Sequence, residues 1–423
     1  MKKVATHTLG CKLNFAETSS LVNKFRQEGY TPVDFKEWAD VYVINTCTVT
    51  AVAEKKCRTV IRQAHKTNPD AIIAVIGCFA QNEASAIAGI EGVDIILGND
   101  QKLNLLDYVK QYQDSLLTNT DQPRSFELAY SQGDRTRTFF KIQDGCDYFC
   151  TYCAIPFARG RSRSATIADT VKVANEIARG GAKEIVLTGV NTGTFGLHQK
   201  EQFIDLLREL DRIEEIERYR ISSIEPNLIT DEILEFVAQS RAFAPHFHIP
   251  IQAASDVVLK NMHRHYDTDF YRRKIFKIKE LMPDACIAAD LMVGFNGETQ
   301  EEFDKGIKFI GEIPISYLHV FTYSDRPNTL ALKMPGKIPM HERRLRSEVM
   351  HQLSNTKRHQ FIQEQMGKTR PVLWESTLRD GMMQGWTDNY IRLQAPASSH
   401  EANTITETEI NDLTIVDNFS FDE

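Results

Sequence analysis

The first hundred residues alternate between unbroken apolar runs and stretches with helical periodicity. The apolar runs cover residues 3–9, 40–46, 71–77 and 93–98, and helical patterns cover 15–28 and 51–65 between them. Unbroken apolar runs are typical of strands buried on both faces of a sheet, and intervening helices indicate parallel crossovers. The pattern predicts an α/β fold that starts with a doubly wound parallel-sheet domain, which we place at residues 1–118.

A second alternating series follows in the middle of the chain. Strand-like segments occur at 138–142, 184–188, 219–223, 246–251, 287–293 and 316–322. Helical segments occur between them at 167–179, 202–213, 231–239, 270–281 and 300–310. Six strands with intervening helices predict a parallel sheet that curves into a partial (β/α)6 barrel, which we place at residues 132–362.

The tail has a different pattern, with short strand-like segments after a helical stretch at 340–365. These segments lie at 371–375, 382–386, 390–393 and 413–416, and residues 387–389 form a turn signal. Several short strands within so few residues predict a small β-barrel at 366–423. Barrels of this kind often bind nucleic acid.

Composition and charge narrow the class of protein. The chain has 423 residues and a net charge of −7, which argues against a globally basic nucleic-acid binder but allows a local basic face. It contains no apolar run of about 18 residues, so a membrane span is not expected. The first residues lack the apolar core of a signal peptide, and we expect a cytoplasmic protein.

Three of the eight cysteines follow predicted strands of the first domain. Cys11, Cys47 and Cys78 each come just after the carboxyl end of a strand, the edge at which open α/β sheets bind ligands. Three converging thiolates can hold a [4Fe-4S] cluster and leave one iron open, although each cysteine could also be a small core residue. Cys57, inside a predicted helix, and Cys286, before a strand, are expected in the core.

Three more cysteines lie within eight residues, directly after the first strand of the predicted barrel. Cys146, Cys150 and Cys153 have the spacing Cys-x3-Cys-x2-Cys, which can wrap three corners of a cubane cluster. Zinc sites usually have four ligands, and no second cysteine pair lies nearby. A disulfide would leave one cysteine unpaired. Iron is therefore the favoured metal.

The cysteine segments resemble the methylthiotransferase family of radical S-adenosylmethionine enzymes over nearly the whole chain. The resemblance rests on residues 8–14 (TLGCKLN), 45–50 (NTCTVT), 77–81 (GCFAQ) and 144–161, which contain the radical motif. It implies an N-terminal cluster domain, a radical core and a C-terminal TRAM-like barrel. It also implies two [4Fe-4S] clusters, held by the two cysteine triplets, and S-adenosylmethionine bound at the open iron next to Tyr152.

Polar residues at the ends of the barrel strands are candidates for contacts with this cofactor. Asn191, Ser223, Glu225 and Gln252 offer groups for its ribose and methionine ends, although each could belong to an ordinary turn. Two segments near these positions, 251–255 (IQAAS) and 294–297 (GFNG), depart from the family pattern.

Five residues are candidates for RNA contact. Arg159 and Arg161 follow the radical motif, where a solvated charge run and a phosphate or carboxylate contact are both plausible. In the tail, Trp386 and Tyr390 could stack on bases, and Arg392 could meet a phosphate. The alternative for Trp386 is a place in the barrel core, where we expect Trp374.

The family has three subgroups, which act on isopentenyladenosine in tRNA, on threonylcarbamoyladenosine in tRNA, or on an aspartate of a ribosomal protein. The TLGCK and NTCTVT segments and residues 319–324 (HVFTYS) resemble the threonylcarbamoyladenosine group. The resemblance implies 2-methylthiolation of that nucleoside at position 37, with the tRNA anticodon stem-loop and a flavodoxin- or ferredoxin-like electron donor as partners. A noncatalytic iron–sulfur protein that binds RNA is the alternative from another class. The sequence assigns no oligomeric state.

Overall fold

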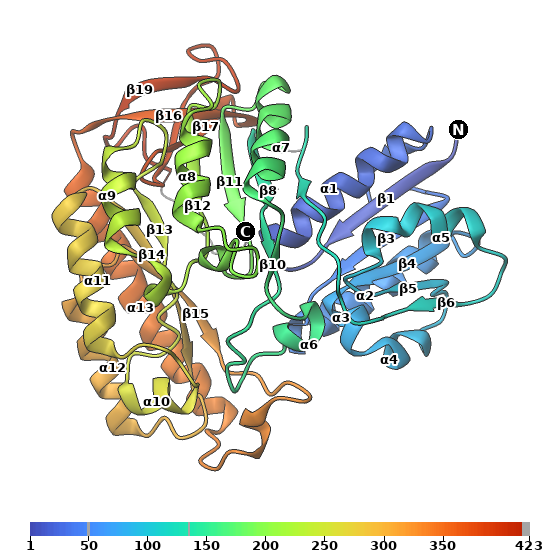
Figure 1. Ribbon diagram of the computed structural model, residues 1–423, viewed down its shortest axis with the longest axis horizontal. Coiled ribbons are helices and arrows are strands. Elements are labelled where there is room, and N and C mark those ends of the chain that lie inside the picture. The colour runs from blue at the N-terminus through green and yellow to red at the C-terminus, as the bar shows by residue number, and fades with distance from the viewer. Residues whose placement is uncertain (49–50, 134–135, 417–423) are drawn as a thin grey trace.

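The computed structural model describes residues 1–48, 51–133 and 136–416 (Figure 1). Residues 49–50 of the NTCTVT segment and 417–423 of the predicted tail domain lie outside the described residues. Figure 1 shows an N-terminal sheet domain on the right, a larger set of strands and helices on the left, and the C-terminal strands above the latter. Across the described ranges, every helix is too short or too polar to cross a bilayer.

The N-terminal domain is a parallel sheet with the strand order β2-β1-β3-β4-β5-β6, which confirms the predicted doubly wound fold. Its strands are β1 (Lys3–Thr8), β2 (Thr31–Val33), β3 (Val41–Thr46), β4 (Ile72–Gly77), β5 (Ile95–Leu97) and β6 (Leu117–Asn119). Its helices are α1 (Lys12–Gln27), α2 (Ala51–Thr67), α3 (Cys78–Asn82), α4 (Ala84–Ala88) and α5 (Leu105–Gln111). The strand order reverses between β1 and β3, which makes the carboxyl ends of these strands the switch point where such sheets bind ligands.

Six parallel strands form the middle of the molecule. They are β8 (Arg137–Lys141), β11 (Glu184–Thr188), β12 (Arg218–Ile221), β13 (His246–His248), β14 (Cys286–Val293) and β15 (Tyr317–Thr322). The sheets β12-β11-β8 and β13-β14-β15 meet through a parallel bridge between Tyr219 and Phe243. The short antiparallel strand β7 (Ala129–Tyr130) precedes them, and β9 (Gln143–Asp144) pairs with β10 (Arg163–Ser164) around the cysteine motif. The predicted six-stranded order is confirmed.

Helices cover the outer face of these strands (Figure 1). They are α7 (Ile167–Arg179), α8 (Phe203–Asp211), α9 (Asp231–Gln239), α10 (Asp256–Asn261), α11 (Thr268–Leu281), α12 (Gln300–Glu312) and α13 (Met340–Gln365). The short helix α6 (Ile155–Arg159) lies instead beside α3 of the N-terminal domain. Thr166, Thr230 and Thr299 cap α7, α9 and α12, because each hydroxyl accepts a hydrogen bond from a backbone N–H of the first turn. These caps fix where the helices begin, and α7 and α9 have the predicted bounds.

The C-terminal strands form a curled antiparallel sheet. They are β16 (Thr369–Arg379), β17 (Met382–Thr387), β18 (Arg392–Pro396) and β19 (Ile405–Glu409), in the order β18-β17-β16-β19. The predicted strand at 413–416 is reduced to a bridge between Leu393 and Ile415, flanked by hydrogen bonds from Gln394 N–H to the Thr414 carbonyl (2.7 Å) and from Val416 N–H to the Arg392 carbonyl (3.2 Å). The fourth strand is β19, which pairs in register with β16. Its sequence, ITETE, is mostly polar, so the pattern of apolar residues does not predict a strand there.

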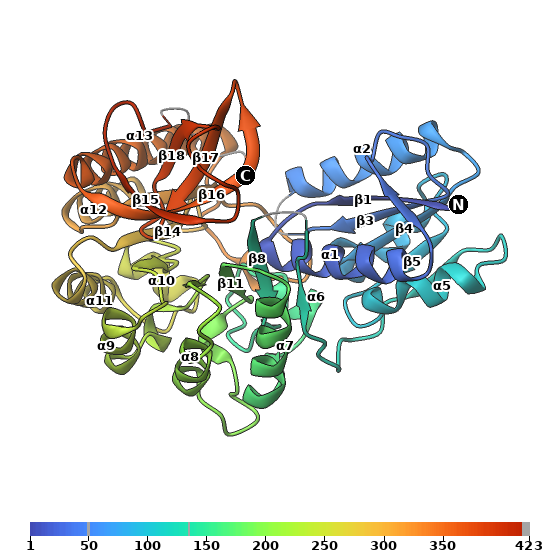
Figure 2. The same cartoon turned by 90° about the horizontal axis from the view of Figure 1, so that it is seen from above.

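Buried charges attach this sheet to the amino ends of two barrel strands. Arg218 donates to the carbonyl oxygens of Trp386 (3.0 Å) and Pro371 (2.9 Å). Arg220 donates to the carbonyls of residues 387 (2.7 Å) and 388 (2.6 Å). Glu184, whose side chain is fully buried, pairs with both arginines. In Figure 2 the C-terminal strands lie on the left and the N-terminal domain lies on the right.

Candidate active site between two cysteine triplets

The structure brings the first cysteine triplet to one edge of the N-terminal sheet. Cys11 is the N-cap of α1, Cys47 follows β3, and Cys78 is the first residue of α3. The loops approach closely: a Cβ on Gly10, whose φ is +107°, would lie 2.9 Å from the Cβ of Cys47. Cys11 is exposed, whereas Cys47 and Cys78 are buried. Strand ends far apart in sequence thus present three thiols toward one place.

Arg159 connects this edge to the second cysteine motif. Its Nε donates to the Sγ of Cys78 (3.3 Å), its Nη1 to the Asp144 carboxylate (2.8 Å), and its Nη2 to Oδ1 of Asn14 (2.5 Å). The residue is only 1% exposed. The predicted role of Arg159 in RNA binding is therefore wrong, because its whole guanidinium is used inside the protein.

A second buried acid completes this connection. Glu17 on α1 accepts from Lys141 on β8 (3.0 Å) and pairs with Lys102 and Arg159. Burial alone would raise the pKa of Glu17, but the three cations hold that pKa well below its usual value. The ionised carboxylate therefore joins the N-terminal domain to the first barrel strand, which fixes the distance between the two cysteine triplets.

The second triplet lies in a tight loop between β9 and α6. The N–H of Cys146 donates to the carbonyl of Gly160 (3.1 Å), and that of Cys153 to the carbonyl of Cys150 (3.0 Å). Burial raises the pKa of Cys146 to about 12 and also raises the pKa values of Cys150 and Cys153. Because burial disfavours the thiolate, these three thiols need a nearby positive charge to ionise. The iron ions of an iron–sulfur cluster supply that charge, so the three cysteines fit this cofactor.

Arg264 is a residue of this site that the sequence reading missed. Its Nη1 lies 3.1 Å from the Sγ of Cys150 and 3.4 Å from the hydroxyl of Tyr152, and the guanidinium is paired with Glu225. Arg264 lies in the connection between α10 and α11, away from any strand end. No periodicity or motif marks it, and only the tertiary fold places it beside the cysteines.

The other predicted cofactor residues surround the same place. Asn191 is buried; its Oδ1 accepts from the N–H of Glu225 (3.3 Å), whereas its Nδ2 has no partner among the described residues. An unpaired buried amide N–H is costly, and a polar ligand would satisfy it. The Ser223 carbonyl accepts from the backbone of Thr192 (3.1 Å).

A cavity of about 210 Å³ adjoins the second triplet. Tyr152, Cys153 and Gln252 lie on its wall, together with residues of β14 and β15. Gln252 adopts a φ of +63°, an uncommon value for a residue other than glycine. Such backbone strain is found at ligand sites, and it turns the chain inward at the cavity wall.

The remaining candidates for RNA contact divide into one exposed and three packed residues. The Arg161 side chain is 75% exposed, forms a 3.7 Å ion pair with Asp147 and lies over the ring of Phe149. Trp386 is 4% exposed and stacks on Tyr390 at 4.4 Å between ring centroids. Arg392 lies over Trp386. Of the two alternatives for Trp386, the structure favours the packed one, because the ring lies under Arg137 of β8. Tyr390 lies against His246.

Sequence comparisons match both halves of this arrangement. Residues 3–98 match the family described as uncharacterized protein family UPF0004, and residues 140–310 match the radical SAM superfamily. The chain is 41% identical to the threonylcarbamoyladenosine tRNA methylthiotransferase MtaB of Bacillus subtilis, over 93% of this chain and 90% of that one. It is 38% identical to the protein of the same name from Aquifex aeolicus, over 93% and 96%.

A second tRNA enzyme and a solved structure are also similar. The tRNA-2-methylthio-N(6)-dimethylallyladenosine synthase of Endomicrobium trichonymphae is 30% identical over 96% of this chain and 97% of its own. The radical S-adenosylmethionine methyltransferase TsrM from Kitasatospora setae, solved with cobalamin and a [4Fe-4S] cluster, has a TM-score of 0.57. That structure covers 95% of this chain and 84% of its own at 13% identity, so the likeness concerns the fold.

Proposed function

Because the chain belongs to the methylthiotransferase family of radical S-adenosylmethionine enzymes, we propose that it methylthiolates C2 of threonylcarbamoyladenosine at position 37 of tRNA. The observation that carries this proposal is the buried guanidinium of Arg159, which donates to Cys78 of the first triplet and to Asp144, two residues before Cys146 of the second. A sulfur-inserting reaction needs two such sites facing one substrate. The names of the more similar relatives support the threonylcarbamoyl substrate over the dimethylallyl one.

We assign a [4Fe-4S] cluster to each triplet, one to Cys146, Cys150 and Cys153 and the other to Cys11, Cys47 and Cys78. When bound, the first would supply the electron that cleaves S-adenosylmethionine, and the second would supply sulfur at its open iron. Tyr152, Asn191 and Gln252 are assigned to S-adenosylmethionine. The buried surroundings exclude water from the reacting groups.

Arg264 and Glu225 act as a pair beside the first cluster. The Arg264 guanidinium, 3.1 Å from the Cys150 sulfur, favours the thiolate form of that ligand. Glu225 neutralises the charge of Arg264, so the pair brings no net charge to the cluster site. It forms a dipole whose positive end lies beside the Cys150 sulfur. Arg159 has the corresponding place at the N-terminal triplet, where it donates to Cys78.

The partners follow from the substrate. The anticodon stem-loop of a tRNA would enter between the two sheet edges, and a flavodoxin- or ferredoxin-like protein would donate electrons. An acidic protein binds RNA through a local basic face, so affinity should fall steeply with salt. Such a reaction belongs in the cytoplasm, where tRNA and reducing proteins are present.

The deciding experiment is anaerobic reconstitution with iron and sulfide, followed by incubation with tRNA, S-adenosylmethionine and a reductant, and nucleoside mass analysis. The proposal expects loss of threonylcarbamoyladenosine and gain of its 2-methylthio derivative. Modified isopentenyladenosine would assign the dimethylallyl activity instead. A noncatalytic iron–sulfur protein would release no 5′-deoxyadenosine, and zinc in place of iron would exclude radical chemistry.

A further inference from the structure

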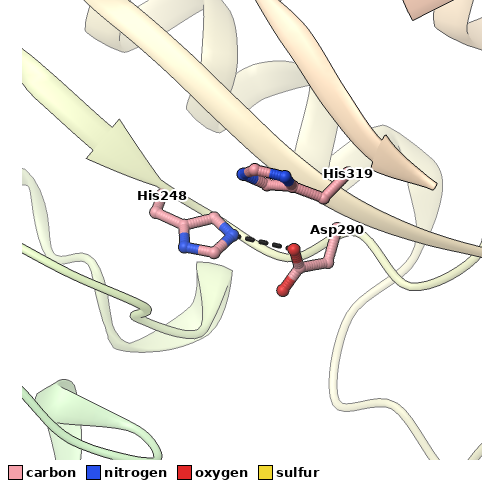
Figure 3. A group of neighbouring side chains, drawn as sticks. All are labelled: His248, Asp290 and His319. Carbon is pink, nitrogen blue, oxygen red and sulfur yellow. Dashed lines mark hydrogen bonds and ion pairs between the residues drawn. The ribbon is translucent and has the colours of Figure 1, made fainter. Parts of the chain in front are cut away.

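Three polar side chains meet on the inner face of the barrel, outside both cysteine sites (Figure 3). His248 ends β13, Asp290 lies on β14, and His319 lies on β15, opposite Asp290 in the strand register. The Nε2 of His248 lies 2.9 Å from a carboxylate oxygen of Asp290, and the two imidazole rings lie 5.3 Å apart between centroids. All three side chains are partly accessible.

This group continues the cavity beside Cys153. Asp290 itself lines the cavity, together with Met292 and Phe321, which point to the same face two residues farther along β14 and β15. Through Asp290, the group therefore adjoins a cavity that Tyr152 and Cys153 also line.

Lys12, which follows Cys11 of the first triplet directly, is exposed at the start of α1. Its positive charge lowers the pKa values of both Asp290 and His319. The polar group therefore lies within electrostatic reach of the residue next to Cys11.

The charge states of the group give it both donors and acceptors. Burial tends to raise the pKa of Asp290, but His248 holds that pKa below its usual value, so the carboxylate stays ionised and accepts hydrogen bonds. Burial and the neighbouring His248 lower the pKa of His319 to about 4, so its neutral ring has one N–H donor and one acceptor nitrogen. Lys12 adds a cationic donor.

We propose that Lys12, His248, Asp290 and His319 form the specificity pocket for the threonylcarbamoyl group of the substrate, an inference that rests on the proposed function. That group carries a carboxylate, a hydroxyl and N–H groups, whereas an isopentenyl group carries none. Lys12 and His319 pair with the carboxylate and the hydroxyl, and Asp290 accepts from the N–H groups. A site built for hydrogen bonds rejects an analogue that leaves its polar groups unpaired.

The competing interpretation is a divalent metal, because two histidines and one carboxylate within 4.8 Å of one another match a known ligand set. Three observations favour the substrate pocket. An Asp290 oxygen is already hydrogen-bonded to His248, and the positive charge of Lys12 would repel a cation. The continuity with the cavity beside Cys153 also points to an organic ligand.

The test uses anticodon stem-loop RNAs that differ only at nucleoside 37. One carries threonylcarbamoyladenosine, a second has the threonyl carboxylate replaced by a carboxamide, and a third carries isopentenyladenosine. Methylthiolation kcat/KM and equilibrium binding are measured for the reconstituted wild type, Lys12→Met, Asp290→Asn and His319→Leu. Lys36→Met and His341→Leu, at exposed positions, are the matched controls.

The wild type and both controls should prefer the carboxylate over the carboxamide by about tenfold or more, the typical size of a hydrogen bond to a charged group. Lys12→Met and His319→Leu should lose most of this preference. Asp290→Asn should reduce the ratio of kcat/KM for the threonylcarbamoyl RNA to kcat/KM for the isopentenyl RNA. Because each readout is a ratio within one preparation, partial loss of folded enzyme does not change it.

Unchanged ratios in all three variants would overturn the pocket while leaving the proposed function intact. If the wild type makes no 2-methylthio product, the proposed function fails, and the binding ratios still decide the pocket. Metal analysis provides the other decisive outcome. One equivalent of zinc or manganese in the wild type that is lost in a His248→Leu/His319→Leu variant would overturn the pocket in favour of a metal site.

Discussion

The two cysteine triplets reach similar chemistry by opposite routes. Cys146, Cys150 and Cys153 lie in one short loop, whereas Cys11, Cys47 and Cys78 come from three separate strand ends. Local sequence holds the triplet of the barrel loop together, whereas only the sheet topology assembles the N-terminal triplet. The site in the barrel loop should therefore tolerate disturbance of the N-terminal domain, and the N-terminal site should not.

A buried arginine accompanies each triplet, and the two arginines show the same contrast between local contacts and contacts across the fold. Arg264 pairs with Glu225 within the barrel. Arg159 instead joins Cys78 and Asn14 of one domain to Asp144 of the other. The comparison teaches that the N-terminal triplet depends on an interface, so damage to that interface should separate the two sites.

The largest expected effect separates the two sites directly. Cys150→Ala should abolish reductive cleavage of S-adenosylmethionine, because it removes a ligand of the cluster beside the cofactor. Cys47→Ala should abolish sulfur insertion and leave cleavage in place. Release of 5′-deoxyadenosine and nucleoside mass analysis measure the two activities. Full methylthiolation by Cys47→Ala would refute the role given to the N-terminal triplet.

Arg159→Met should weaken the interface on which the N-terminal triplet, Cys11, Cys47 and Cys78, depends. It leaves Glu17 and Asp144 with fewer cationic partners in a buried place, and breaking such a network costs about 3–5 kcal/mol. Denaturant unfolding monitored by circular dichroism measures the change. Arg212→Met, which removes an exposed ion pair with Glu209, is the control and should change stability by less than about 1 kcal/mol. Equal losses in both variants would contradict the assigned network.

Gly10→Ala should disturb only the N-terminal triplet, by roughly 1–3 kcal/mol of local strain. The new Cβ would lie 2.9 Å from the Cβ of Cys47, at a φ of +107°. Iron and sulfide content should fall toward one cluster per chain, with cofactor cleavage retained. Gly29→Ala is the matched control, since it also has a positive φ (+82°) but no heavy atom within 4 Å. Two intact clusters in Gly10→Ala would show that the loops are not held so closely.

The smallest effect is expected at the exposed end of the radical motif. Arg161→Ala should change the free energy of unfolding by less than about 0.5 kcal/mol, because its ion pair to Asp147 is long and solvated. If Arg161 contacts a phosphate, the slope of log affinity against log salt should fall by about one. An unchanged slope in tRNA titrations would leave Arg161 as an ordinary surface charge.

The sequence by itself determined the elements and the local cluster motif. Apolar runs and helical periodicity placed the six barrel strands, and α7 and α9 with their bounds, because these signals are local. Strand ends also indicated Cys11, Cys47 and Cys78, since parallel topology brings such ends to one edge. Cys57 and Cys286, expected in the core, are buried.

Only the tertiary structure decided which polar side chains are inside. The sequence makes Arg159 a candidate for RNA contact and leaves Trp386 open between RNA and the core, yet Glu17 and Asp144 enclose Arg159, and Trp386 packs against Arg137 of the barrel. Arg264 and the pairing of His248 with Asp290 carry no sequence signal at all. Whether a charge is buried depends on partners far away in the chain, and sequence periodicity reports only on neighbours.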